Sequence, residues 1–169
     1  MNLSKANLQQ SVDSETVRSV TKLSLVAVWL VVMLFLLTLI PGVDRVVPQT
    51  PVTLAAVIGA IITLVLVGIL GYLAPKAAAL TKMSLDGPQE LVEHAAGAVY
   101  WLIILVAVLV AHSGLAGALL PLFDGFTWVY DVLFMLAAVP VLVVIGARLY
   151  GLLDPSSELV AEKVTGNSR

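Results

Sequence analysis

Two polar side chains within apolar stretches, Asp131 and His112, are the residues of this sequence best suited to chemistry. A carboxylate can hold a neighbouring imidazole in its charged form, and such a pair can take up and release a proton. His112 is eight residues before the end of the apolar segment 95–120, and Asp131 is five residues into the next segment, 126–149. At 1.5 Å per helical residue these depths are about 12 Å and about 8 Å. Because a tight turn joins the segments, a contact between the two side chains is geometrically possible, with Ser113 as a further polar group nearby.

This candidate pair has two interpretations. In the functional one, Asp131 and His112 are protonatable groups in a proton-coupled pathway. In the structural one, Asp131 is shallow enough to meet headgroup water, and His112 bonds to Asp131 or to a backbone carbonyl and fixes the two helices. A carboxylate at mid-membrane costs about 2.5–3.5 kcal/mol, and less near the interface. The modest depth and the single acid favour the structural interpretation.

A haem site would need axial ligands on facing helices. Both histidines, His94 and His112, lie in one helical stretch, 18 residues apart. That separation is about 27 Å along a helix, so they cannot share one iron. A histidine–methionine pair with Met33 or Met135 is conceivable, but methionine more often packs than ligates. We therefore expect no haem.

Other catalytic and metal-binding signatures are equally weak. Glu90, Glu93 and His94 have helical spacing that could bind a metal, although a solvated helix face explains them better. The chain has no cysteine, which excludes disulfides, thiolate metal sites and thiol catalysis. We find no nucleophile–base set, phosphate loop or HExxH motif. The sequence predicts no enzyme, no metal site and no cofactor.

The elements that position these residues follow from composition. Of 169 residues, 60% are hydrophobic and 12% are charged, which is about half the charge of a typical soluble domain. Four apolar segments are each long enough for a helix that crosses about 30 Å of hydrocarbon: residues 23–40, 52–73, 95–120 and 126–149. Only Asp131 and Arg148 are charged within them. We expect an all-α membrane protein, an antiparallel bundle of four transmembrane helices.

The basic residues predict how this bundle is oriented. Eight of the nine lysines and arginines flank one end of the predicted helices, and only Arg45 lies at the other end. Positive charge concentrates on the cytoplasmic side of membrane proteins. The expected cytoplasmic parts are the N-terminal segment 1–22, the loop 74–94 and the tail 150–169. Both termini are then cytoplasmic.

Prolines and capping residues predict where the helices begin and bend. We expect a short interfacial helix from residues 13–14 into the first span, an end of the second helix at Pro75, and a start of the third helix at Pro88. Pro140 should kink the fourth helix, and residues 154–158 should break or restart the chain beyond it.

Small residues recur at spacings of three and four in the second and third segments. Such stripes let helix backbones approach closely in a membrane. The predicted packing residues are Ala55, Gly59, Thr63, Gly68, Ala107, Ala111 and Gly114. The stripes are equally compatible with contacts inside the bundle and with a dimer face.

These observations favour a non-catalytic integral membrane subunit or scaffold that associates with other membrane proteins. The alternative is a small oligomeric channel or proton-coupled transporter that uses Asp131 and His112. A third class is a cofactor-binding redox or enzymatic subunit. The expected partners are the lipid bilayer and either further copies of the chain or another membrane protein. A net charge of −2 gives no indication of nucleic-acid binding.

Overall fold

The protein folds into four long helices with short connections. The computed structural model describes residues 3–85, 87–123 and 125–166, with side chains described for residues 16–85, 87–123 and 125–152. The helices are α1 (Leu3–Leu37), α2 (Leu54–Ser84), α3 (Gln89–Leu119) and α4 (Thr127–Gly166), with a short 3-10 helix, η1 (Leu120–Leu122), after α3. Within the described ranges, the β-structure is one isolated bridge between Val46 and Thr53. The expected all-α, four-helix fold is confirmed.

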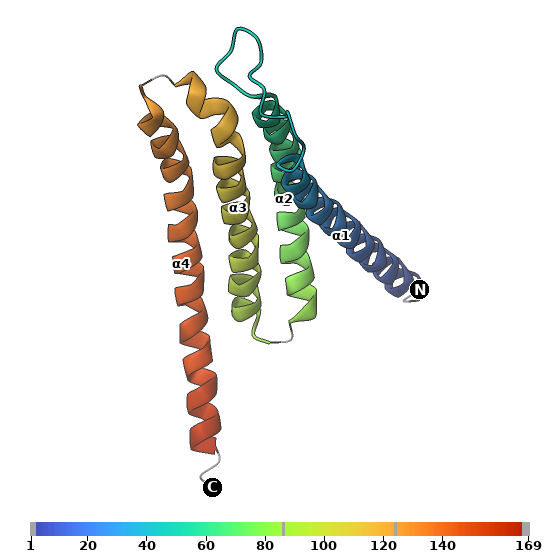
Figure 1. Ribbon diagram of the computed structural model, residues 1–169. Coiled ribbons are helices and arrows are strands. Elements are labelled where there is room, and N and C mark those ends of the chain that lie inside the picture. The colour runs from blue at the N-terminus through green and yellow to red at the C-terminus, as the bar shows by residue number, and fades with distance from the viewer. Residues whose placement is uncertain (1–2, 86, 124, 167–169) are drawn as a thin grey trace.

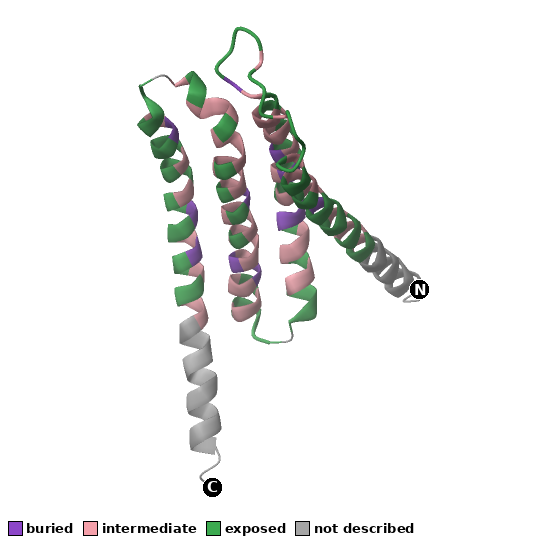
Figure 2. Cartoon of the chain, in the orientation of Figure 1, coloured by how far each residue is buried: buried purple, intermediate pink, exposed green. Residues whose placement is uncertain are grey.

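Each of the four helices contains a segment long and apolar enough to cross a membrane. These segments are Thr16–Leu37, Leu54–Ser84, Gln89–Leu122 and Thr127–Leu152. Their mean hydropathy lies between 2.4 and 2.7, yet at most 17% of the most apolar window in any of them is buried within the bundle. Many large apolar residues are therefore exposed, and Figure 2 shows exposed positions along the described part of each helix. This is the architecture of a multi-pass membrane protein, in which lipid takes the place of a thick protein core.

Consecutive helices run antiparallel, and the main interfaces join neighbours in the chain (Figure 1). The contact of α2 with α3 is the most extensive, that of α3 with α4 is next, and α1 packs least and leans away from the others. The long loop 38–53 and the turn after η1 lie at one end of the molecule. The start of α1, the end of α4 and the ends of α2 and α3 that face each other across residues 85–88 lie at the other. Helix α3 therefore lies between α2 and α4 and contacts both.

Local sequence explains two helix starts. Pro88 occupies the N-cap position of α3, immediately before Gln89, close to the expected start. Thr53 caps α2, its hydroxyl accepting a hydrogen bond from the backbone N–H of Ala56 at 3.2 Å. Gly125 has a φ of +78°, a backbone conformation that favours glycine, in the tight turn that leads into α4.

Three expected helix boundaries are wrong. Pro75 lies inside α2, which continues to Ser84. Helix α4 runs to Gly166, past residues 154–158, and α1 begins at Leu3, well before residues 13–14. A proline inside a helix costs about 3 kcal/mol, but each further residue of a formed helix adds a backbone hydrogen bond without a new nucleation cost. At Pro75, the adjacent residues Leu73 and Ala74 are buried, so packing offsets the penalty.

Thr63 of α2 packs directly against the backbone of α3 at Gly114. The Thr63 side chain is fully buried, and a Cβ placed on Gly114 would lie 2.1 Å from its Oγ1. Only glycine leaves room for this threonine. The predicted packing role of both residues agrees with this geometry.

The other residues of the predicted stripes differ in burial and in the helix that they face. Ala107 is buried, and Ala55 and Ala111 are half-buried. Gly59 faces α1, because a Cβ placed on it would lie 4.0 Å from Cδ2 of Leu34. Gly68 is exposed with nothing within 4 Å of its Cβ position, so it makes no close helix contact within the bundle. Helical spacing alone does not say which of several neighbouring helices a residue faces, or whether it faces one.

Candidate functional site: the His112–Asp131 pair

The structure brings His112 of α3 and Asp131 of α4 into direct contact. The Nε2 atom of His112 lies 3.1 Å from Oδ1 of Asp131. The tight turn between the helices sets their register and so places both residues at a similar distance from it. The contact has the geometry of a hydrogen bond, and it is an ion pair when the imidazole is protonated.

Two aromatic side chains of α4 hold the His112 ring. The Tyr130 ring stacks on it, with centroids 5.2 Å apart and an interplanar angle of 28°. Phe134 meets it edge to face at 5.1 Å. Tyr130 and Phe134 also contact each other at 4.9 Å, so the three rings form one cluster. This cluster fixes the imidazole plane and leaves its Nε2 directed at Asp131.

Tyr130 adds a second polar link between α3 and α4. Its hydroxyl donates a hydrogen bond to the backbone carbonyl oxygen of His112. The tyrosine is only 2% exposed, which makes it one of the most buried large side chains of the bundle. The buried hydroxyl thus finds an acceptor in the facing helix, as buried tyrosines usually do.

The pair lies on the outside of the bundle. The side chains of His112 and Asp131 are 41% and 68% exposed. They line an open surface cavity of about 210 Å³ between α3 and α4, whose other walls include Leu109, Phe134 and Met135. Within the described part of the chain, His112 is the one hydrogen-bonding partner of the Asp131 carboxylate. The site is an apolar groove with a carboxylate at its edge.

Ser113, the third predicted member of the site, does not join the pair. Its hydroxyl donates to the backbone carbonyls of Leu109 and Val110 within its own helix, at 3.0 and 3.3 Å. This is a common arrangement for serine in a membrane helix. The Ser113 hydroxyl therefore already has hydrogen-bond acceptors within α3 and is not directed at the pair.

The residues weighed as a metal site lie at the opposite end of α3. Glu90 and Glu93 are exposed, whereas the His94 ring packs against α4, within 2.9 Å of a Cβ position on Gly151. Among the residues whose positions are described, no group of three or more histidine, aspartate or glutamate side chains is arranged to hold a metal ion.

Tyr130 and Phe134 are parts of the site that were not predicted from the sequence. A signal was present, because residues four apart share one face of a helix and these two flank Asp131. The sequence does not identify them as part of the site, because aromatic residues near the ends of membrane helices ordinarily anchor the helix at the interface. Only the packing of α4 on α3 distinguishes Tyr130, which is buried, from Trp128 nearby, which is 60% exposed.

Fold and site together define an all-α protein with four helices able to cross a membrane and an ionisable pair on the outer face of the last two. The sequence matches no protein-family model, and neither the curated proteins nor the solved structures with which it was compared match it.

Replacing Tyr130 by phenylalanine should weaken the α3–α4 contact without disturbing the ring cluster. The change removes one hydroxyl and leaves the His112 carbonyl without that donor. We expect the free energy of unfolding to fall by about 1 kcal/mol, measured by thermal unfolding in one detergent. Tyr150→Phe, at a tyrosine that is 68% exposed, is the matched control and should change nothing. Equal effects of the two substitutions would contradict a structural role for the Tyr130 hydroxyl.

Proposed function

We propose that this protein is a non-catalytic membrane subunit that associates with a transmembrane helix of another membrane protein through the α3–α4 face around Asp131. The observation that carries the proposal is the exposure of the pair. An ionisable side chain within a membrane ordinarily faces a protein partner or water. Here the Asp131 carboxylate is 68% exposed beside an apolar groove on the outer surface.

The hydrogen-bonding groups around Asp131 favour a different protein over a second copy as the occupant. The Tyr130 hydroxyl is used by the His112 carbonyl, and the Ser113 hydroxyl is used within α3. His112 is already bonded to Asp131 through Nε2. A second copy packed against this face would bring the same hydroxyl and imidazole groups to the same depth, and these already have hydrogen-bonding partners within their own chain. A partner helix with an arginine, lysine, amide or hydroxyl side chain would supply a new donor to the carboxylate.

The outward position of the pair also bears on the transporter alternative. A proton pathway through one copy would place its ionisable groups toward the bundle interior or a water-filled cavity. In this protein, a proton pathway through the interior of one bundle would not pass Asp131. A proton pathway that used Asp131 would have to lie at an interface between two chains. The distribution of basic residues supports a subunit with both termini in the cytoplasm.

Site-specific photocrosslinking tests the proposed occupant. A photoreactive amino acid is placed at Met135, which lines the groove, and at Leu133, which is 56% exposed on the same helix. Two residues along a helix are about 200° apart, so the two probes sample different sides of α4 at similar depth. We expect Met135 in native membranes to crosslink to one partner peptide with a hydrogen-bond donor in its span, and Leu133 to crosslink mainly to lipid.

Three results would overturn the proposal. They are lipid adducts alone at Met135, equal labelling of one protein from both positions, and crosslinks only to a second copy of the chain. If crosslinks between copies were accompanied by proton or solute flux in proteoliposomes that Asp131→Asn abolishes, the transporter alternative would replace it.

A further inference from the structure

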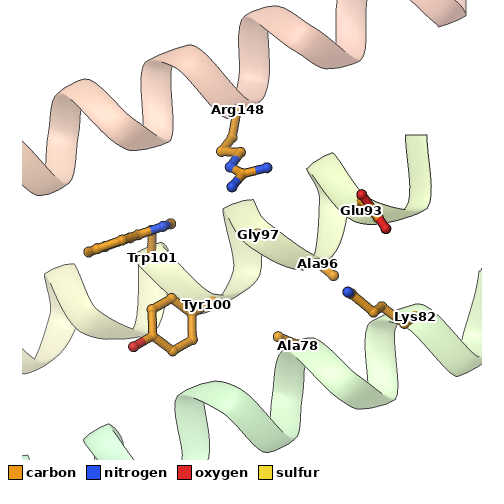
Figure 3. Close-up of a pocket in the computed structure, with 8 residues that line it drawn as sticks. All are labelled: Ala78, Lys82, Glu93, Ala96, Gly97, Tyr100, Trp101 and Arg148. Atoms are coloured by element: carbon orange, nitrogen blue, oxygen red, sulfur yellow. The ribbon is translucent and has the colours of Figure 1, made fainter. Parts of the chain in front are cut away.

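A second cavity lies at the opposite end of the bundle, between α2, α3 and α4. It has a volume of about 340 Å³ and is open to the outside. Figure 3 shows Arg148 reaching into it from α4 and Lys82 reaching toward it from α2, on either side of α3. Ala96 and Gly97 form the part of α3 between the two cations. Small side chains at these positions leave the space that the cavity occupies.

Arg148 is held in the cavity by its contact with Gly97. A Cβ on Gly97 would lie 3.1 Å from Nε, 3.2 Å from Cδ and 3.3 Å from Cζ of the arginine. The side chain therefore lies against the backbone of α3 and does not extend freely along α4. Arg148 is half-buried, and no carboxylate in the described part of the chain is within ion-pair distance of it. An arginine fixed in this way presents unused donors to the cavity.

The remaining lining residues suit an anion at a membrane surface. Lys82 is exposed and makes no ion pair within the described residues. Glu93 lies one turn along α3 from Gly97. Its single negative charge is outweighed by the two positive charges of Lys82 and Arg148, so the lining side chains carry a net positive charge. Tyr100 and Trp101 pack edge to face at 5.3 Å, and such rings are typical of the headgroup level. The cavity thus combines two cations with groups that favour the interface.

From this arrangement we propose that the cavity binds a phosphate group, with Arg148 and Lys82 as its cationic ligands. A guanidinium offers parallel N–H donors that match phosphate oxygens, and lysine adds a point charge. Basic cavities between transmembrane helices are suited to lipid headgroups. Because the cavity is open to the outside, a phosphate carried on an anionic lipid can occupy it while the acyl chains stay in the bilayer.

Native mass spectrometry of the full-length protein in mild detergent tests this site. The probes are phosphatidylglycerol, phosphatidylcholine and inorganic phosphate, each added separately, and phosphate is also added as a competitor. We expect retention of phosphatidylglycerol over phosphatidylcholine. Each of Arg148→Gln and Lys82→Gln should reduce that retention by about fivefold, as expected when one cation near an anionic headgroup is lost. Glu93→Gln should increase it.

Two further variants separate loss of binding from loss of structure. Lys76→Gln removes a cation of α2 that lies over the Tyr72 ring, outside the cavity, and should leave retention unchanged. Arg148→Lys keeps the charge and should bind better than Arg148→Gln. Binding of inorganic phosphate that competes fully with the lipid identifies a soluble phosphate as the source; retention of the lipid alone identifies the headgroup. Equal retention of both lipids with no phosphate binding, or equal losses with Lys76→Gln and Arg148→Gln, would overturn the proposal.

Discussion

Gly114→Ala should destabilise the bundle more than any other single methyl addition at a described glycine. The new Cβ would lie 2.1 Å from Oγ1, 2.5 Å from Cγ2 and 2.8 Å from Cβ of Thr63. Thr63 is completely buried and cannot swing away, so α2 and α3 must separate along their main interface. Overpacking of this kind costs about 1–3 kcal/mol. For a chain of this length, each kcal/mol lowers the unfolding midpoint by about 2–4 °C.

Two controls make the Gly114 experiment specific. At Gly68 and Gly146 nothing lies within 4 Å of the Cβ position, so alanine there should leave stability unchanged or raise it through helix propensity. Thr63→Ala removes the two closest atoms and should restore part of the stability lost in Gly114→Ala. Thermal unfolding of all variants in one detergent gives the comparison. A drop common to all three glycine variants, or no rescue by Thr63→Ala, would contradict the proposed contact.

Asp131→Leu should strongly weaken partner association while the protein is still inserted and folded. Removing a carboxylate from a membrane helix favours insertion, because the acid costs about 2.5–3.5 kcal/mol at mid-membrane and less near the interface. A hydrogen bond to a charged group contributes about 1.5–3 kcal/mol, so association should weaken by about ten- to hundredfold. Asp131→Asn keeps the size and one acceptor oxygen, and its effect should be intermediate. The measurement is the amount of partner retained during purification in mild detergent.

The matched control for Asp131 is Asp44→Leu, which removes an exposed carboxylate from the loop 38–53 at the same end of the molecule. It should leave association unchanged. Thermal unfolding of the isolated chain should show that Asp131→Leu is still folded and loses, relative to Asp44→Leu, only the contribution of its hydrogen bond to His112, about 0.5–1.5 kcal/mol. If both variants keep the partner, Asp131 is not part of the interface.

Fold class and span number follow from the sequence because they depend on local composition. A run of apolar residues long enough to cross the hydrocarbon must form a helix to satisfy its backbone hydrogen bonds. Charges are nearly absent from four such runs, and the structure has four corresponding helices. The register of one helical hairpin is similarly local, since the short turn near Pro121 predicts similar depths for His112 and Asp131. Helix ends beyond the spans were predicted less well, because a formed helix extends without a new nucleation cost and because, at Pro75, the buried residues Leu73 and Ala74 offset the cost of the proline.

The tertiary structure alone decided which way each side chain faces. A membrane helix is apolar on all sides, so the sequence contains little amphipathic pattern that separates its buried face from its lipid face. For this reason the small-residue stripes could not distinguish Thr63, which is buried, from Gly68, which is exposed. For the same reason, the sequence placed Asp131 level with His112 without showing that its carboxylate lies on the outer surface. Depth is set by the position of a residue along its own helix, whereas the direction in which its side chain points is set by how that helix packs against its neighbours.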